Sequence, residues 1–177
     1  HRGFEARAEE RSWHQVVPFV ERLQSNSSML AASAYCLAAE KLLGAEAPLR
    51  ASWLRVLGGE LGRAVDHFGR LAALARVLGA EAPGAWAQAA RVHLSSLLEK
   101  LSGAPTMHHY IRLGGVSAPL PEGFGPSSRR VLQGVHRDLD EFDRSLGKNR
   151  IFVDRLRGRG RLSAEQCLAF SVTGPLL

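Results

Sequence analysis

The chain has 177 residues, of which 45% are hydrophobic and 23% charged, and these are the proportions of a globular protein with a real core. No run approaches the roughly 20 apolar residues that a membrane-spanning helix needs. The net charge of +6 comes mainly from arginines spread along the whole chain. The one dense cluster, at 155–161, has no aromatic or groove-reading pattern beside it, which argues against a nucleic-acid partner. Cys36 and Cys167 stand alone, so they form no metal-binding or redox motif.

The first part of the chain is dominated by helical periodicity. Residues 1–5, H-R-G-F-E, are expected to leave a strand and turn into a helix. A helix over 7–23 should follow, with a kink or break at Pro18. After a polar break, residues 29–43 predict a second helix. This helix carries the apolar residues Leu30, Ala34, Leu37, Ala38 and Leu42.

Residues 48–78 predict the helix around which the other segments are organised. It would measure roughly 46 Å at about 1.5 Å per residue. Its continuous apolar stripe consists of Leu54, Leu57, Leu61, Val65, Phe68, Leu71, Ala75 and Leu78. Glu60, Arg63 and His67 fall together at the edge of that stripe, as a structural polar network that is either exposed or half-buried against a neighbour. Three further charged residues are expected on the far side of the helix: Arg55, Asp66 and Arg70.

The second part of the chain changes character. A helix over 85–101 is followed by a short extended segment and a proline-rich and glycine-rich loop, which together occupy 106–126. Helices are predicted over 127–146 and 149–156, and a capping box at 163–166 opens a last short one. The predicted fold class is therefore mainly α: a helical bundle with a small strand-and-loop insert.

We expect the chain to form a single domain. It would consist of a helical core at 7–102, the insert at 106–126 and C-terminal helices at 127–170. The chain begins at His1, inside what looks like a motif, and stops after residues 174–177 without a tail. We therefore expect a fragment of a longer subunit, truncated at both ends.

A series of motifs runs through the whole chain in a consistent order. They are H-R-G-F-E at 1–5, A-x-E-K-L-L-G at 38–44, A-P-x-R-A at 47–51, L-R-V at 54–56, E-L-x-R-x-x-x-H at 60–67, H-x-Y-I-R-x-G-G-V at 108–116, L-P-E-G-F at 120–124, R-L-R-G-x-G at 155–160 and V-T-G-P at 172–175. In order and spacing they resemble the large quinone-site subunit, of the D type, of NADH-quinone oxidoreductase (respiratory complex I). They also resemble the related large subunits of membrane-bound nickel–iron hydrogenases. The set is far more specific than any one motif alone.

The resemblance implies a helical bundle docked on a small subunit that carries the last iron–sulfur cluster, with quinone bound between the two. The chain would be one subunit of an NADH:quinone oxidoreductase-type enzyme, without a complete active site of its own. It would bind no cofactor alone, since the cluster belongs to a partner and NAD(H) to another subunit. Its partners would be quinone, other peripheral-arm subunits and membrane-embedded subunits. The resemblance places it peripherally, on the cytoplasmic side of the inner membrane.

Several positions depart from the family pattern. Hydrogenases bind nickel through cysteines where this chain has Q-S-N-S at 24–27, so it offers no thiolate and hydrogenase activity is not expected. At position 25, complex I carries a tyrosine that hydrogen-bonds the quinone head group, whereas Ser25 offers a hydroxyl on a shorter stem. Met107 stands where a histidine near the cluster is expected, and His108 beside it is a candidate substitute.

Other positions of the predicted site are retained. Arg22 corresponds to a residue that lies against the cluster, and Glu5 to a carboxylate that serves as a proton gate in hydrogenases. Arg112 is retained, as is the glycine pair after it. Structural alternatives remain for two of these residues: a helix-end charge for Arg22 and a capping carboxylate for Glu5. An alternative function also remains, a divergent scaffold subunit of a hydrogenase-related membrane complex that has lost the redox site.

Overall fold

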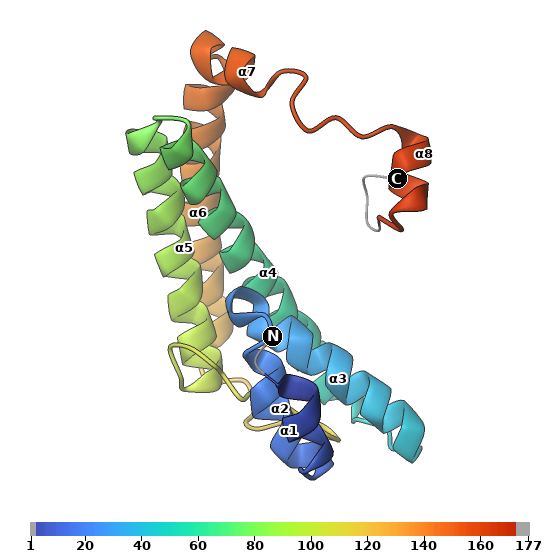
Figure 1. The fold of residues 1–177 in the computed structure, drawn as a ribbon. Helices are drawn as coiled ribbons and strands as arrows, with labels where there is room; N and C mark the ends of the chain where they lie inside the picture. The colour runs from blue at the N-terminus through green and yellow to red at the C-terminus, as the bar shows by residue number, and fades with distance from the viewer. Residues whose placement is uncertain (1–2, 173–177) are drawn as a thin grey trace.

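A computed structural model describes residues 3–172, and it confirms the mainly α fold class (Figure 1). The helices and strands follow in this order: α1 (Phe4–Glu9), α2 (Trp13–Glu21), the 3-10 helix η1 (Ser25–Ser27), α3 (Ser28–Leu43), α4 (Leu49–Val77), α5 (Glu81–Ser102), β1 (Ile111–Arg112), β2 (Gly115–Val116), α6 (Phe124–Gly147), α7 (Arg150–Leu156) and α8 (Ala164–Ala169). The two strands form an antiparallel hairpin in which Ile111 pairs with Val116.

The 29-residue helix α4 is the longest in the described part of the chain, as its periodicity predicts. α5 packs along it, α6 packs on α5, and α3 crosses the N-terminal part of α4 (Figure 1). The predicted stripe of α4 faces this core, with five members buried and Leu57, Leu71 and Leu78 half-buried. α5 contributes Ala87, Ala90, Leu94, Leu97, Leu98 and Leu101 to the same core. α2 packs on α3, so the bundle holds α2 beside the hairpin at one end of the molecule.

The helix predicted over 7–23 is two helices, and the break is not at Pro18. The chain turns between α1 and α2, where the Ser12 N–H donates to Gln15 Oε1 (3.2 Å) and begins α2. Pro18 lies inside α2. Its missing N–H leaves only the carbonyl of His14 without its helical donor, which a short helix at the surface tolerates.

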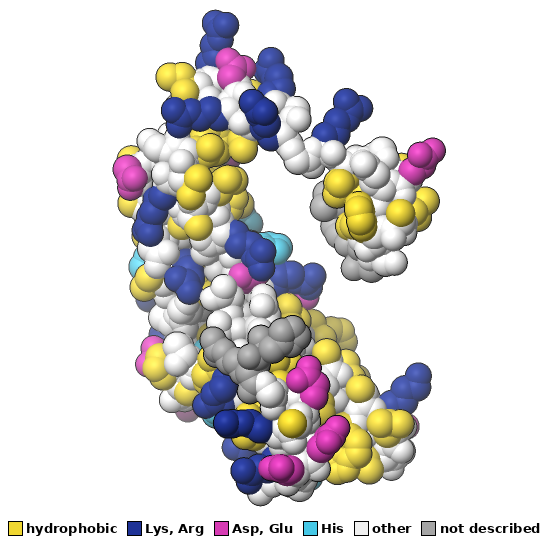
Figure 2. All heavy atoms as spheres, in the orientation of Figure 1, with side chains coloured by type: hydrophobic (Ala, Val, Ile, Leu, Met, Phe, Trp, Pro, Cys, Tyr) yellow, Lys and Arg dark blue, Asp and Glu magenta, His cyan; other side chains and the backbone are white. Residues whose placement is uncertain are grey.

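The apolar residues noted for this helix do not form the buried side of α3. Leu37 and Leu42 are 59% and 76% exposed, and hydrophobic side chains cover the outer end of α3 in Figure 2. The buried side consists of Ser28, Met29, Ala32, Cys36, Ala39 and Glu40. Alanine, leucine and methionine occupy both sides of this helix, so hydrophobic periodicity alone does not choose between them.

Two helices begin earlier than predicted, α5 at Glu81 and α6 at Phe124. In each, a proline (Pro83 or Pro126) lies in the first turn, where an amide without a hydrogen has no intrahelical partner to lose. The capping box at Ser163 is confirmed: the Gln166 N–H donates to Ser163 Oγ at 3.2 Å. The predicted strand exit at residues 1–2 lies outside the described residues.

Candidate functional site

A buried ion pair joins α3, α4 and the hairpin. Arg55 donates from Nη1 to Glu40 Oε2 (2.9 Å) and from Nη2 to Glu40 Oε1 (2.5 Å). Both residues are 5% exposed, so the prediction that Arg55 points to the far side of α4 is wrong. Asp66, expected beside it on the far side, is also buried and pairs with Arg70 at 2.9 Å. For Arg55 the reason is that α3 covers a second side of α4, where Met29 and Leu30 lie over Gly58 and Gly59 and the glycines give no hydrophobic signal.

The same ion pair holds the hairpin backbone. Arg55 Nη2 donates to the carbonyl of Arg112 (2.8 Å) and Arg55 Nε to that of Gly115 (3.1 Å), while Glu40 Oε1 accepts from the Gly114 N–H (2.7 Å). The hydrogen bonds from the Arg55 guanidinium hold the pKa of Glu40 below its ordinary value, against the opposing effect of burial. Glu40 is therefore a carboxylate at neutral pH and acts as an internal anchor for the turn at Gly114.

A second buried carboxylate ties the segment before the hairpin to α2. Glu21 is fully buried at the end of α2, and its two oxygens accept from the backbone N–H of His109 at 3.0 and 3.2 Å. The His109 imidazole lies alongside, with Nδ1 3.0 Å from Glu21 Oε2. His109 and Met107 both adopt positive φ, 46° and 49°, which is uncommon for residues with a side chain. The contact with Glu21 holds His109 in this conformation.

The His109 segment and α2 enclose a small cavity of about 370 Å³. Its walls are apolar apart from the two imidazoles and one guanidinium, and its lining residues are His14, Val17, Pro18, His109, Ile111, Arg112 and Leu113. The cavity thus combines an apolar interior with imidazole and guanidinium side chains, which can hydrogen-bond a ligand.

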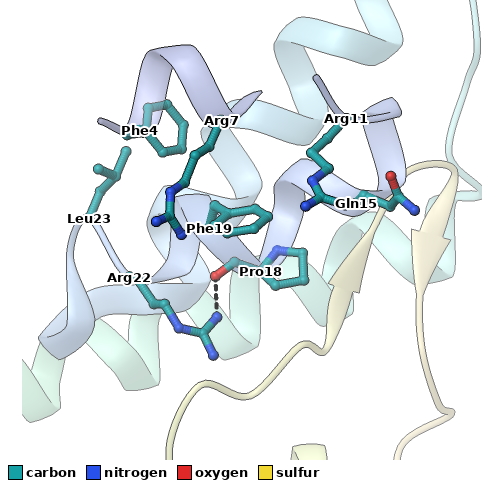
Figure 3. Close-up of a pocket in the computed structure, with 8 residues that line it drawn as sticks. All are labelled: Phe4, Arg7, Arg11, Gln15, Pro18, Phe19, Arg22 and Leu23. Atoms are coloured by element: carbon teal, nitrogen blue, oxygen red, sulfur yellow. Dashed lines mark hydrogen bonds between the residues drawn. The ribbon is translucent and has the colours of Figure 1, made fainter. Parts of the chain in front are cut away.

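A larger open pocket lies between α1 and α2, on the other side of Pro18 (Figure 3). We call it the arginine pocket. Its volume is about 710 Å³, and it is lined by Phe4, Arg7, Arg11, Gln15, Pro18, Phe19, Arg22 and Leu23. Arg22 Nη1 donates to the carbonyl of Pro18 (2.6 Å), which turns its side chain back along α2. Within residues 3–172, none of its three arginines forms a salt bridge.

The structure brings some of the predicted site residues together at α2. Arg22 lines the arginine pocket and Arg112 lines the small cavity, on the two sides of Pro18. Ser25 is exposed in η1, just beyond the end of α2, and lines neither space. Glu5 is exposed on α1 and does not line the arginine pocket, although both Phe4 and Arg7 do.

His108 and His109 point in different directions. The Nδ1 of His108 lies 3.0 Å from Ser102 Oγ and 2.9 Å from the carbonyl of Ala104, so this imidazole caps the end of α5. Met107 beside it is half-buried and lines neither space. The histidine that faces α2 is His109, which the sequence did not single out, although the pair H-H at 108–109 is the available signal.

The polar trio on α4 lies on its solvent side. Arg63 Nη2 pairs with Glu60 Oε1, and both side chains are about half exposed. His67 is exposed one turn further on. By contrast, the buried Glu40 and Arg55, which the sequence did not mark as site residues, belong to the A-x-E-K-L-L-G and L-R-V motifs.

Two further properties of the described residues bear on what the site binds. No group of three His, Cys, Asp or Glu side chains in the range 3–172 converges as metal ligands. None of the helices in that range is long and apolar enough to cross a membrane. Lysine and arginine side chains are scattered along the visible face with acidic side chains among them, and they do not form one continuous band (Figure 2).

The fold and site define a helical chain that is organised by one buried ion pair, with two pockets at α2 that combine apolar side chains with arginine or histidine. The family described as the 49 kDa subunit of respiratory-chain NADH dehydrogenase matches residues 78–177, and the chain belongs to this family. The resemblance stated from the motifs is thereby confirmed.

Relatives match over the whole chain, and all three named here are D-type subunits of NADH-quinone oxidoreductase. The chain is 39% identical to the one from Anaeromyxobacter dehalogenans (strain 2CP-C), of which it covers 41%. It is 38% identical to the one from Myxococcus xanthus (strain DK1622), covering 43%, and 37% identical to the one from Clostridium beijerinckii (strain ATCC 51743 / NCIMB 8052), covering 48%. The chain therefore spans less than half the length of these curated relatives.

A solved structure shares the fold. It is a chain of the membrane-bound sulfane sulfur reductase (MBS), an archaeal respiratory membrane complex, with a TM-score of 0.93 and 32% sequence identity. The match covers 99% of this chain and 47% of that chain. The arrangement of α1 to α8 is thus one that a subunit of a respiratory membrane complex adopts.

Proposed function

We propose that this chain is part of a peripheral subunit of a complex I-like NADH-quinone oxidoreductase, on the cytoplasmic side of the membrane. It would form part of the wall of the quinone-reducing site, next to an iron–sulfur cluster carried by a partner subunit. The observation that carries the proposal is the similarity to the D-type subunits over all 177 residues. NAD(H) would bind to another subunit, and membrane-embedded subunits would complete the complex.

Arg22 is suited to act on the cluster by its charge. It lies at the end of α2, and within the described residues it has no carboxylate partner. A guanidinium stays protonated at any physiological pH and therefore presents a fixed positive charge. Beside a cluster it would stabilise the reduced, more negative form and raise the reduction potential.

Ser25 is suited to contact the quinone head group. It is exposed one turn beyond Arg22, in the 3-10 helix that leads into α3. Its hydroxyl can donate one hydrogen bond to a quinone carbonyl oxygen. Because its stem is shorter than that of tyrosine, the head group would bind nearer to α2 or through a bridging water.

The residues on the hairpin side would supply charge and protons. Arg112, His14 and His109 meet at the small cavity, and buried Glu21 holds the backbone of His109 in place. An imidazole can act as a proton donor, and quinone reduction consumes protons. We propose His109 for the role that the resemblance assigns to a histidine near Met107, because it faces α2 whereas His108 faces α5.

The experiment is to assay the purified complete complex with Ser25→Ala. Loss of one hydrogen bond of about 0.5–1.5 kcal/mol should raise KM for quinone by about 2–10-fold, while NADH oxidation by an artificial acceptor that bypasses the quinone site stays unchanged. Arg22→Met should lower the midpoint potential of the nearest cluster, measured by redox titration with electron paramagnetic resonance. Ser96→Ala is the control, because the Ser96 hydroxyl bonds only within its own helix, to the carbonyl of His93. Quinone reduction that responds neither to Ser25→Ala nor to a quinone-site inhibitor would contradict the assignment.

The alternative is a scaffold subunit that has lost the redox site. Two observations support this alternative. Ser25 and Met107 replace two specific family residues, and the solved relative is described as a sulfane sulfur reductase. If the chain is such a scaffold, the Ser25 and Arg22 variants would change neither the KM for quinone nor the potential of the cluster. Substitutions that disrupt the packing of α3 or α4 would still dissociate the complex.

A further inference from the structure

The arginine pocket brings three positively charged side chains to one place. Arg7, Arg11 and Arg22 contribute three guanidiniums from α1, the following turn and the end of α2 (Figure 3). No carboxylate within residues 3–172 pairs with them, although Glu9 and Glu10 are close in sequence. Like charges placed together repel, so the arrangement is stabilised when an anion enters.

The floor of the pocket is apolar. Phe4 and Leu23 form one side of this floor, and Pro18 and Phe19 form the other side (Figure 3). Leu23 is 59% exposed at this floor. A free inorganic anion would satisfy the guanidiniums but leave the apolar floor in water. The pocket therefore fits an occupant that carries both an apolar group and negative charge.

We propose that the arginine pocket is the docking site for an acidic segment of a neighbouring protein subunit. An aliphatic or aromatic side chain of that segment fills the floor, and its Asp or Glu carboxylates pair with Arg7 and Arg11. Arginine suits this role because its planar fork binds a carboxylate through two parallel hydrogen bonds. The volume of about 710 Å³ holds several side chains of such a segment.

The choice of a neighbouring subunit rests on the proposed function. Arg22 lines one end of the pocket. The proposed function places the same residue beside the partner's cluster, so the pocket would continue the interface with the subunit that carries this cluster. The chain also has a net charge of +6, which complements an acidic partner surface. The segment then anchors the partner close to Ser25, since Leu23 at the edge of the pocket precedes Ser25 by two residues.

The first test is cross-linking in the complete complex with the double variant Arg7→Lys/Arg11→Lys. Lysine keeps the positive charge and supplies an amine that a carbodiimide joins to a carboxylate within contact distance. We expect a new cross-linked peptide that contains an Asp or Glu of another subunit. Arg129→Lys/Arg137→Lys is the matched control, because these two arginines line a shallow groove on α6 with Leu132. The control should not produce that cross-link.

The second test reverses the charge. Arg7→Glu/Arg11→Glu should lower retention of the cross-linked subunit by at least about tenfold after a high-salt wash. Replacing the identified partner carboxylate with lysine should restore retention in that variant. Arg129→Glu/Arg137→Glu should leave retention unchanged, which separates local pairing from overall charge.

Three results would overturn the proposal. They are cross-links only within the same polypeptide, loss of bound phospholipid instead of a subunit on charge reversal, and absence of any new cross-link. Neither test uses quinone. A complex that docks through the pocket but does not reduce quinone would contradict the proposed function alone, and one that reduces quinone without the cross-link would contradict the docking alone.

Discussion

Arg55 on α4 binds Glu40 on α3 through two hydrogen bonds, and the same two side chains hold the backbone of the hairpin at Arg112, Gly114 and Gly115. One ion pair therefore fixes two consecutive helices and a hairpin that lies more than 50 positions further along the chain. Since the hairpin carries Arg112 and follows directly after His109, the pair also orients the wall of the small cavity against α2. The stability of the fold and the geometry of the candidate site depend on the same contact.

Removing one member of this pair should destabilise the full-length subunit strongly. Glu40→Ala leaves the Arg55 guanidinium buried without its counterion, and we expect a loss of about 3–5 kcal/mol in the free energy of unfolding. The control is Glu60→Ala, which removes an exposed ion pair with Arg63 and should cost about 0–1 kcal/mol. Denaturant unfolding measures both. Equal effects of the two variants would show that the buried pair has no special role.

A double variant separates the pair from the hairpin contacts. Glu40→Leu/Arg55→Met removes both charges, so it should destabilise less than the sum of Glu40→Leu and Arg55→Met. It should still be less stable than the wild type, because the Gly114 N–H and the carbonyls of Arg112 and Gly115 lose their partners. Additive effects would contradict direct coupling between the two side chains.

The depressed pKa of Glu40 predicts how stability depends on pH. The hydrogen bonds from Arg55 lower the pKa of this carboxyl in the folded state. Its contribution is therefore fully present above the ordinary glutamate pKa of about 4.3 and is lost as pH falls through the lower folded value. Unfolding curves of the full-length subunit from pH 7 downward, compared with Glu40→Gln, should converge as pH falls below that range. A gap between the two proteins that stays constant to low pH would contradict the prediction.

The sequence predicts helix α4 well, but it does not predict the buried contacts of Glu40, Arg55 and Glu21, and the reason is physical. The side of α4 that meets α5 carries large apolar residues such as Leu61 and Phe68, and these produce the three- and four-residue periodicity. The side that meets α3 contains glycines together with Arg55, so its burial leaves no hydrophobic signal. Glu21 and His109 are 88 positions apart, and nothing in local spacing indicates that they meet.

The glycines on the side of α4 that faces α3 give a prediction with an internal control. A Cβ at Gly58 would lie 2.5 Å from the sulfur of Met29, so this buried side chain would have to shift. Gly58→Ala should therefore cost about 1–3 kcal/mol through overpacking between α3 and α4. A Cβ at Gly62 meets no atom within 4 Å, so Gly62→Ala should stabilise the helix by up to about 1 kcal/mol. Thermal unfolding of the two variants should shift in opposite directions, and shifts of the same sign would refute the close packing at Gly58.

Glu21 should control the conformation of the segment before the hairpin. Glu21→Ala removes both oxygens that accept from the His109 N–H, and leaving that donor without a partner should cost about 1–3 kcal/mol. Glu21→Gln keeps one amide oxygen as an acceptor and should cost less. Hydrogen exchange reports the effect directly, because the His109 amide should exchange faster in Glu21→Ala. The amide of Gly114 serves as the control, since Glu40 holds it independently. If both amides lose protection equally, the hairpin moves as one unit and Glu21 does not act on His109 alone; if neither does, this carboxylate does not hold the segment.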